Sequence, residues 1–492
     1  MKKAFDNKKY IKLQKDKILE RVQQFDNKLY IEFGGKLFDD YHASRVLPGF
    51  EIDSKLKVLM TLKNQIEVII SISADDIQTG KVRNDIGLSY EDEVLNLVDK
   101  FESHGLLVGG IVITMYNQQP LAKIFYHKLK NLNLNVYLHY PINGYPHQTD
   151  YILSEDGFGR NDYIETTHPI VIVTGPGPGS GKMATCLSQL YHENLKGIRS
   201  GYAKYETFPS WNLPLKHPVN LAYEAATADL CDVNMIDYFH LEAYGKSTVN
   251  YNRDLEVFPV LNKMFEKIYG KSPYLSPTDM GVNMVGFAIS DEEEAIKASK
   301  QEIIRRYLDA CCFNKMGKFK IDAVEKIERI MNELNITTDN RKVVRAALDY
   351  TQKVQCPVVA IEVGKHIVYG KKTELFTASA AAVINALKYL AKLPKEMPLL
   401  SYSLIEPIQN LKKEQLKKRT QRLHLNDVLI ALAITATTNE MAKAALSQLP
   451  KLKGAQLHSN VMIDTDDIEI IHKLKIDATM GTYQDTKLLK EF

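Results

Sequence analysis

Short apolar runs that alternate with amphipathic stretches dominate the first two hundred residues. The runs are rich in β-branched residues and are predicted to be strands, at 29–33, 67–73, 109–116, 135–141 and 169–175. Helical patterns near 88–103 and 119–131 separate some of them. This alternation is typical of βαβ units, and continuous apolar runs such as IVITM and IVIVT favour strands buried on both faces. We therefore expect an α/β fold with a mostly parallel sheet covered by helices.

The chain is long enough for several domains. Its 492 residues exceed what one hydrophobic core comfortably serves. An α/β domain is predicted over 1–290, including a stretch at 200–290 whose prolines and aromatic residues favour ordered loops. Apolar residues then recur in helical stripes over 291–350, which predicts a helical subdomain. The α/β alternation resumes over 351–492, which predicts a C-terminal domain.

Charge and composition exclude several classes of partner. The chain has 63 basic and 60 acidic residues, so we expect no nucleic-acid partner. We expect no membrane partner either, because the best apolar run, 428–436, is about half the length needed to cross a bilayer. The basic N-terminus lacks the apolar core of a secretory signal, and the 5 cysteines form no C-x-x-C pair. These features favour the cytoplasm.

A glycine-rich loop between a predicted strand and a predicted helix, PIVIVTGPGPGSGKMATC, carries the strongest chemical signal. Glycines permit positive φ and close backbone approach, so successive N–H groups can point at one anion beside the positive end of the helix. Such a loop suits a nucleotide or another phosphorylated small molecule. The residues predicted to hold the phosphate are Gly175, Gly177, Gly179, Ser180, Gly181 and Lys182.

The loop departs twice from the phosphate-loop pattern G-x-x-x-x-G-K-[ST]. Pro176 stands where the first glycine should be, and Met183 replaces the residue whose hydroxyl binds Mg²⁺. The second departure argues against magnesium handling and against a true ATPase. The alternative interpretation is a glycine-rich turn that merely reverses the chain.

Two further segments are candidate sites. Gly34, Gly35 and Lys36 follow the first predicted strand and could contact phosphate in the same way, or could form a tight turn with solvated charges. Asp237 and His240 are candidates for acid/base work or for organising a metal, although a helix would also place them on one face for structural reasons.

No metal site is predicted in the C-terminal part. The polar residues near its apolar runs lack ligand spacing such as H-x-x-x-H; they are His424, Asn426, Asp427, His458 and Asp464.

Four segments together carry a resemblance to a known family: IEFGGKLFDDYHASRVLPGF, VTGPGPGSGKMATCLSQLYH, KYETFPSWNLPLKHPVNLAYEAATADL and SPTDMGVNMVGF. The chain resembles, over essentially its whole length, the bacterial proteins of the DUF1846 or UPF0371 family. The resemblance implies an α/β N-terminal portion, a helical middle, an α/β C-terminal domain and a homo-oligomer. It supplies no reaction and no catalytic residue.

The leading hypothesis is a cytosolic enzyme that binds a nucleotide or other phosphorylated metabolite at residues 175–182. The alternative is a non-catalytic ligand sensor or assembly protein, in which the loop is structural or binds a regulatory anion. A third possibility is transfer chemistry on a phosphorylated sugar without Mg²⁺, which would need histidine and aspartate side chains near the loop.

Overall fold

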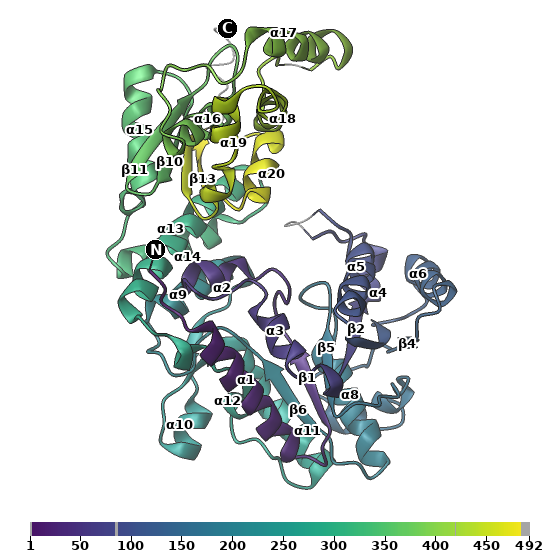
Figure 1. Cartoon of the computed structure of the whole chain (residues 1–492). Coiled ribbons are helices and arrows are strands. Elements are labelled where there is room, and N and C mark those ends of the chain that lie inside the picture. The colour runs from purple at the N-terminus through teal and green to yellow at the C-terminus, as the bar shows by residue number, and fades with distance from the viewer. Residues whose placement is uncertain (1, 84–86, 419, 484–492) are drawn as a thin grey trace. The chain divides into compact units, whose positions relative to one another are not determined.

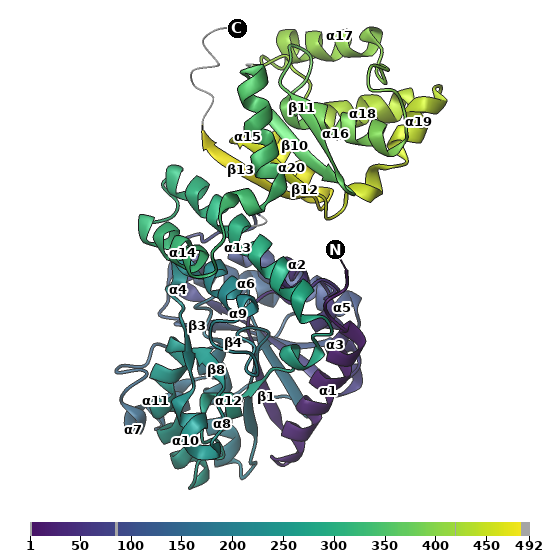
Figure 2. The same ribbon diagram turned by 90° about the vertical axis from the view of Figure 1, so that its left-hand side faces the viewer.

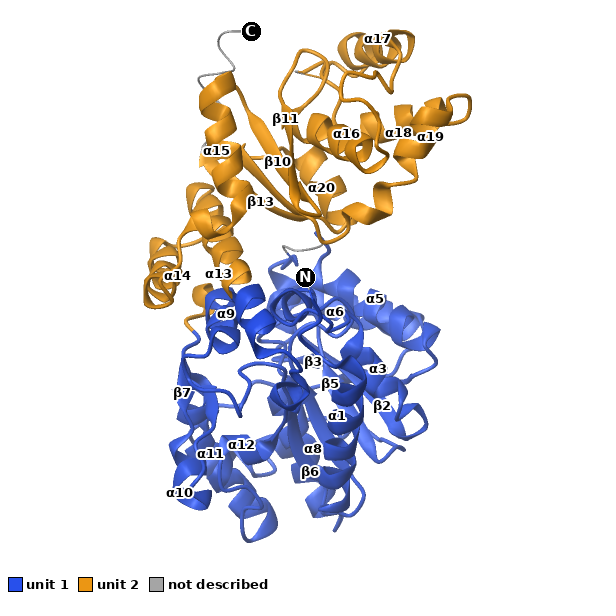
Figure 3. Cartoon of the chain, turned by 60° about the vertical axis from the view of Figure 1, so that its left-hand side comes forward, with its two compact units in different colours: residues 1–227, 232–299 blue, residues 228–231, 300–492 orange. Residues whose placement is uncertain are grey.

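The computed structural model describes residues 2–83, 87–418 and 420–483. This described part of the chain forms two compact units, coloured separately in Figure 3. Unit 1 comprises residues 1–227 and 232–299, and unit 2 comprises residues 228–231 and 300–492. None of the described helices combines the length and the apolar character that crossing a membrane requires.

Among the residues that the structure describes, unit 1 is built on a seven-stranded sheet (Figure 1). Its strands, in spatial order, are β4 (Val136–Leu138), β3 (Leu107–Thr114), β2 (Ile66–Ser73), β5 (Ile170–Thr174), β1 (Leu29–Phe33), β6 (Gly201–Tyr205) and β9 (Gly281–Val282). Neighbouring strands run parallel throughout. β2 and β5 are buried along their whole length, as their apolar runs indicate. The predicted α/β fold with a mostly parallel sheet is confirmed.

Helices cover both faces of this sheet. The described helices that lie wholly in unit 1 are α1 (Asn7–Gln23), α2 (Tyr41–Val46), α3 (Ser54–Met60), α4 (Ala74–Gln78), α5 (Tyr90–Ser103), α6 (Pro120–Asn131), α7 (Thr149–Ile152), α8 (Lys182–Leu195), α9 (Pro218–Ala226), α10 (Tyr238–Tyr244), α11 (Asn252–Tyr269) and α12 (Pro277–Met280). A small antiparallel ribbon of β7 (Asn234–Ile236) and β8 (Val249–Tyr251) precedes α11.

Alternating side chains of the central strands show which helix lies on which face. Tyr30 of β1 donates a hydrogen bond to Glu193 of α8 at 2.7 Å. Tyr205 of β6 points to the opposite face, because successive residues of a strand alternate, and its hydroxyl lies 2.9 Å from that of Tyr10 in α1. Figure 2 shows the same arrangement, with α1 and α3 on one side of β1 and α8 and α11 on the other.

The stretch from 200 to 290 contains more regular structure than predicted. Its longest element, α11, has 18 residues and includes Pro259. This helix buries a stripe of apolar side chains at helical spacing, including Leu255, Phe258 and Leu261. The burial of that stripe outweighs the hydrogen bond that proline removes. α11 lies between the two proline- and aromatic-rich segments, 205–220 and 274–283, that favour ordered loops.

Unit 2 has, within its described residues, a four-stranded sheet in the order β11 (His366–Lys371), β10 (Val358–Val363), β12 (Gln456–Val461) and β13 (Asp477–Tyr483). β12 and β13 are parallel and the other pairs are antiparallel. Its helices are α13 (Glu292–Lys315, which begins in unit 1), α14 (Ile321–Glu333), α15 (Lys342–Val354), α16 (Ala378–Leu390), α17 (Tyr402–Asn410), α18 (Leu425–Thr435), α19 (Glu440–Leu446) and α20 (Thr465–Lys473). Val359 and Ile361 pack with α16 and α18, whereas Val358 and Ala360 pack with α15. The sheet therefore separates two cores.

Candidate functional site

Three neighbouring strands of unit 1 end level with one another. Glu32 of β1 is aligned with Val173 of β5 on one side and with Lys204 of β6 on the other. The residues that follow the three strands at this edge are Gly34, Gly175 and Glu206. Open parallel α/β sheets bind their ligands outside the carboxyl ends of the strands. The loops after β1, β5 and β6 therefore share the edge at which a ligand is expected.

The loop after β5 presents the N-terminus of α8. Gly179 and Gly181 have φ values of 80° and 85°, in the left-handed region that glycine adopts at little cost. Gly181 is the N-cap of α8 and has no side chain that could accept a hydrogen bond from the first turn. The first N–H groups of a helix lack acceptors within the helix. They face the loop together with the positive end of the helix dipole.

Close packing fixes the first half of this loop. A Cβ atom at Gly175 would lie 2.4 Å from the main-chain oxygen of Ser71, and one at Gly177 would lie 2.2 Å from the hydroxyl of Tyr90. No larger residue fits at either position without a shift of its neighbours. These two glycines hold the loop against β2 and the start of α5.

Lys182 folds back over its own loop. Its Nζ donates hydrogen bonds to the main-chain oxygen of Gly177 at 3.1 Å and to Ser180 Oγ at 3.3 Å. Burial lowers the pKa of Lys182, although the negative charge of Glu32 acts against this change. Among the described residues no carboxylate forms an ion pair with the amine. A partly buried cation whose partners are neutral oxygens is suited to meet an anion.

Next to the loop lies a cluster of charged side chains, which we call the β6 charge cluster: Glu32, Tyr202, Lys204, Glu206 and Asp254. Tyr202 Oη donates to Glu32 Oε2 at 2.6 Å. Lys204 Nζ lies 2.6 Å from Asp254 Oδ1 and 2.9 Å from Glu206 Oε1. This arrangement brings polar groups of β1, β6 and α11 together on the α8 face.

Burial sets the protonation of this cluster. It raises the pKa of Glu206 to about 7, with Lys204 opposing the rise and Asp254 adding to it. Burial alone would lower the pKa of Lys204, but the two carboxylates raise it well above its usual range. A carboxyl group that titrates near neutrality can take up or release a proton at physiological pH.

The sequence analysis missed the β6 charge cluster. β6 has the sequence GYAKY, without the apolar run by which the other strands were found. The available signal is the alternation of Tyr202, Lys204 and Glu206, which places three polar groups on one face of a strand. Nothing local marks Asp254 as the partner of Lys204, because it comes from a helix far along the chain.

The second predicted turn lies at the same edge. Gly35 has φ 71°, and a Cβ atom there would lie 3.5 Å from Lys55 Nζ. Lys55 is buried and pairs with the buried Asp40 at 2.8 Å. Gly34 is half-buried and Lys36 is exposed. The turn therefore stands beside the loop at 175–182, one strand away.

Asp237 and His240 lie at the start of α10. Asp237 Oδ1 accepts a hydrogen bond from the main-chain N–H of His240 at 3.0 Å, and its Oδ2 accepts from the hydroxyl of Thr278 at 2.6 Å. His240 Nδ1 lies 2.9 Å from Ser276 Oγ. These contacts cap α10 and connect it to α12. Within the described ranges, neither residue forms a hydrogen bond or an ion pair with the loop at 175–182.

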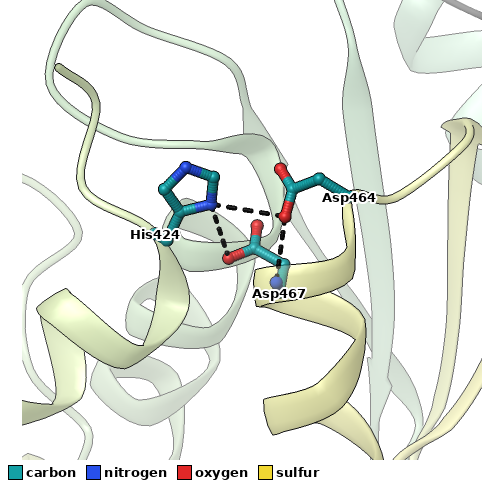
Figure 4. A group of neighbouring side chains, drawn as sticks. All are labelled: His424, Asp464 and Asp467. Atoms are coloured by element: carbon teal, nitrogen blue, oxygen red, sulfur yellow. Dashed lines mark hydrogen bonds and ion pairs between the residues drawn. The ribbon is translucent and has the colours of Figure 1, made fainter. Parts of the chain in front are cut away.

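Unit 2 contains a separate group of one histidine and two aspartates, shown in Figure 4. His424 Nδ1 lies 3.3 Å from Asp464 Oδ1 and 3.5 Å from Asp467 Oδ1. Asp464 Oδ1 accepts from the main-chain N–H of Asp467 at 2.9 Å, and Asp467 Oδ1 accepts from that of Leu425 at 2.7 Å. The sequence analysis named His424 and Asp464 only as polar residues without ligand spacing, and it did not name Asp467. The spacing of these residues in the sequence does not reveal the group, because its members lie at the starts of two helices that are far apart in the sequence.

The electrostatics of this group favour an ion pair between the imidazole and the two carboxylates. Hydrogen bonds to Asp464 and Asp467 raise the pKa of His424 to about 9. The imidazole is therefore protonated at neutral pH and offers Nδ1 as a donor to both carboxylates. Both carboxylates also face helix N-termini, which repel a further cation. The group is suited to hold the starts of α18 and α20 together.

Of the other polar residues named in unit 2, Asp427 adjoins this group, because its Oδ2 accepts a hydrogen bond from the main-chain N–H of His424 at 2.9 Å. His458 Nδ1 lies 2.9 Å from Thr479 Oγ1, and burial lowers the pKa of His458 to about 3. Asp427 pairs with Lys412 at 2.6 Å. Asn426 is exposed in the first turn of α18.

Fold and site together define a two-unit α/β protein with a glycine-rich loop and a helix N-terminus at the carboxyl edge of a parallel sheet. The chain belongs to the DUF1846 family, because family models for the N-terminal and C-terminal domains of unknown function DUF1846 match residues 3–335 and 339–489. Similar proteins include the UPF0371 proteins of Streptococcus pneumoniae strains Hungary19A-6 and CGSP14. Each is 54% identical over 483 residues, covering 98% of both chains. The names of the family and of these relatives state no activity.

Proposed function

We propose that unit 1 binds a phosphorylated small molecule, such as a nucleotide or a sugar phosphate, at the loop formed by residues 175–182. The observation that carries the proposal is Lys182, a partly buried cation at the glycine-capped start of α8 with only neutral oxygens as partners. A phosphate at this position would meet the first N–H groups of α8, the helix dipole and the amine of Lys182 together.

The proposed binding does not require magnesium. Met183 stands where a phosphate loop has its metal-binding hydroxyl, and the nearest hydroxyl residues, Ser180 and Thr185, are fully buried. Ser180 Oγ is in addition engaged with Lys182. These features favour binding without Mg²⁺-dependent hydrolysis. They also support the second candidate function, a non-catalytic ligand sensor.

Isothermal titration calorimetry with inorganic phosphate, ATP, GTP and hexose phosphates tests the proposal. The wild type should bind at least one of them, and Lys182→Ala should weaken that binding tenfold or more, since a charge-assisted hydrogen bond contributes about 1.5–3 kcal/mol. Lys196→Ala is the matched control, because it removes the same charge at the exposed C-terminal end of the same helix. Excess EDTA should leave the affinity unchanged.

Two outcomes would refute the proposal. One is the absence of binding for every phosphate compound tested. The other is equal affinity in the wild type, in Lys182→Ala and in Lys196→Ala, with far-ultraviolet circular dichroism showing that all three proteins are folded.

A further inference from the structure

The edge beside the proposed phosphate site continues across β1 to β6. Because β5, β1 and β6 end level with one another, the ends of β5 and β6 are separated by two strand spacings, about 10 Å. A ligand that begins at Lys182 and extends along the edge in this direction reaches the first residues after β6. A phosphorylated sugar or polyol is long enough to do so.

The path across β1 is not filled by side chains of the turn that follows it. Gly34 and Gly35 come directly after β1, and a Cβ atom at Gly34 would have only the main-chain oxygen of Tyr205 within 4 Å, at 3.8 Å. Gly35 is exposed, and its φ of 71° disfavours a larger residue. The two glycines therefore leave room above the end of β1, between the loop and β6.

The segment after β6 is held rigidly by its main chain. Ser210 N donates to Asn220 Oδ1 at 2.7 Å. The main-chain oxygens of Phe208, Pro209 and Ser210 accept hydrogen bonds from the side chains of Tyr251, Asn283 (2.8 Å) and Asn220 (3.2 Å), respectively. Residues 206–211 thus have fixed positions without help from a ligand, as a preformed binding surface requires.

Side chains of the same segment have polar atoms that the protein does not satisfy. Thr207 Oγ1 and Trp211 Nε1 are buried and, among the described residues, have no hydrogen-bond partner. Thr207 is 6% exposed. The ring of Trp211 lies against Gly281 of β9, the strand next to β6. Ser210 Oγ is also without a partner, but it packs beside Gly286. Buried polar groups in folded proteins nearly always have a partner, so Thr207 Oγ1 and Trp211 Nε1 are available to bond to a ligand or to a water molecule.

The β6 charge cluster makes the region after β6 suitable for binding hydroxyl groups. An ionised carboxylate only accepts hydrogen bonds, whereas a protonated one also donates, and a sugar or polyol hydroxyl can do both. The carboxyl group of Glu206 can therefore pair with a hydroxyl in either protonation state. Glu206 is 7% exposed and Lys204 is its direct neighbour, so a hydroxyl here would meet an acceptor and a cation side by side. Thr207 Oγ1 and Trp211 Nε1 would supply further hydrogen bonds.

We infer that the ligand of unit 1 is a phosphorylated polyol or sugar, whose phosphate lies at the loop formed by residues 175–182 and whose hydroxyl groups lie across Gly34 on Glu206, Thr207 and Trp211. The inference rests on the proposed function, because it assumes the phosphate site at Lys182. It goes further by assigning the residues after β6 to the rest of the ligand.

The test compares phosphate compounds that differ in hydroxyl content. Calorimetric titrations use glycerol 3-phosphate, ribose 5-phosphate, glucose 6-phosphate and myo-inositol 1-phosphate. The controls are n-hexyl phosphate and inorganic phosphate, which have no hydroxyl group on carbon. At least one hydroxylated compound should bind the wild type at least about tenfold more tightly than n-hexyl phosphate does. Thr207→Val should weaken that compound about fivefold and leave inorganic phosphate unchanged.

A matched variant controls for the loss of a threonine hydroxyl. Thr61→Val removes a hydroxyl that donates to the main-chain oxygen of Val58 in α3, and it should bind all compounds like the wild type. Glu206→Gln keeps the shape of the side chain and should also weaken only the hydroxylated compounds.

The outcomes separate this inference from the proposed function. If n-hexyl phosphate binds as tightly as every hydroxylated compound, or if Thr207→Val has no effect on the tightest of them, the inference is wrong. Sensitivity of inorganic phosphate to Lys182→Ala would then still support the phosphate site. If no phosphate compound binds in a way that depends on Lys182, both the proposed function and the inference fail.

Discussion

Replacement of His424 by asparagine tests the ion pair in unit 2 most directly. His424 is the N-cap of α18, and asparagine is a favourable N-cap residue, so His424→Asn removes the titrating charge and places a capping side chain at the start of the helix. In the wild type the protonated imidazole lies between the carboxylates of Asp464 and Asp467. The variant should lose this interaction and keep α18.

The size and the pH range of the effect follow from the pKa of His424. A pKa raised from 6.5 to about 9 corresponds to at most about 3 kcal/mol of stability. The side chain of Asp464 is 49% exposed, so screening by water reduces the expected value to about 1–2 kcal/mol. Because the folded state binds this proton more tightly than the unfolded state, the contribution is complete below pH 6.5 and is lost as the pH rises through about 9.

Urea unfolding followed by far-ultraviolet circular dichroism measures the difference between the two proteins. At about pH 6 the wild type should be more stable than His424→Asn, and at about pH 10 the difference should disappear. Fluorescence of Trp211, the single tryptophan, reports on unit 1 and provides an internal control. A difference that is constant over this range, or a His424 ring that titrates near 6.5 by NMR, would refute the reasoning. So would a loss of stability on addition of EDTA, since the group would then hold a metal.

Two further pairs of substitutions test the packing of unit 1 by urea unfolding. Gly181→Ala combines a left-handed φ with a Cβ atom 2.7 Å from Thr114 and should cost about 2–4 kcal/mol, whereas Gly179→Ala has the same strain but open space and should cost about 1 kcal/mol. Equal costs would show that the loop is not packed as described. Burial would raise the pKa of Asp40, but Lys55 at 2.8 Å lowers it, so Lys55→Met leaves a buried charge unpaired and should cost about 3–5 kcal/mol. Adding Asp40→Asn, which removes the charge and keeps an acceptor for the main-chain N–H of Ala43, should recover most of this loss; a double variant as unstable as the single one would contradict the assignment.

The strands of unit 1 could be predicted where burial on both faces leaves an apolar run. β2 and β5 were predicted in this way. Each lies between parallel strands and is covered by helices on both faces, so both of its faces need apolar side chains. β6 was not recognised, because its buried face carries Tyr202 and Lys204, whose polar groups are satisfied by partners far along the chain. The strand order could not be predicted either, since the sequence does not state that β1 lies between β5 and β6.

The candidate site was likewise predicted from the sequence only in part. The loop around Lys182 was predicted because its glycines and lysine are contiguous, so local sequence alone specifies it. The pairing of Lys204 with Asp254 depends on tertiary contact, as does the approach of His424 to Asp467. Asp237 illustrates the opposite case. Its carboxylate was a candidate catalytic group in the sequence. In the structure it caps α10 and accepts a hydrogen bond from Thr278, and its role in catalysis stays a prediction.

The position of β1 between β5 and β6 imposes an order on folding during synthesis. β1 is the first strand to be made, but its neighbours in the sheet are residues 170–174 and 201–205. β2, β3 and β4 can pair with one another much earlier. Leu29–Phe33 must therefore wait for distant partners, and such long-range pairing is slow. A nascent chain that ends before β6 leaves an apolar strand with an open edge, to which another chain could add.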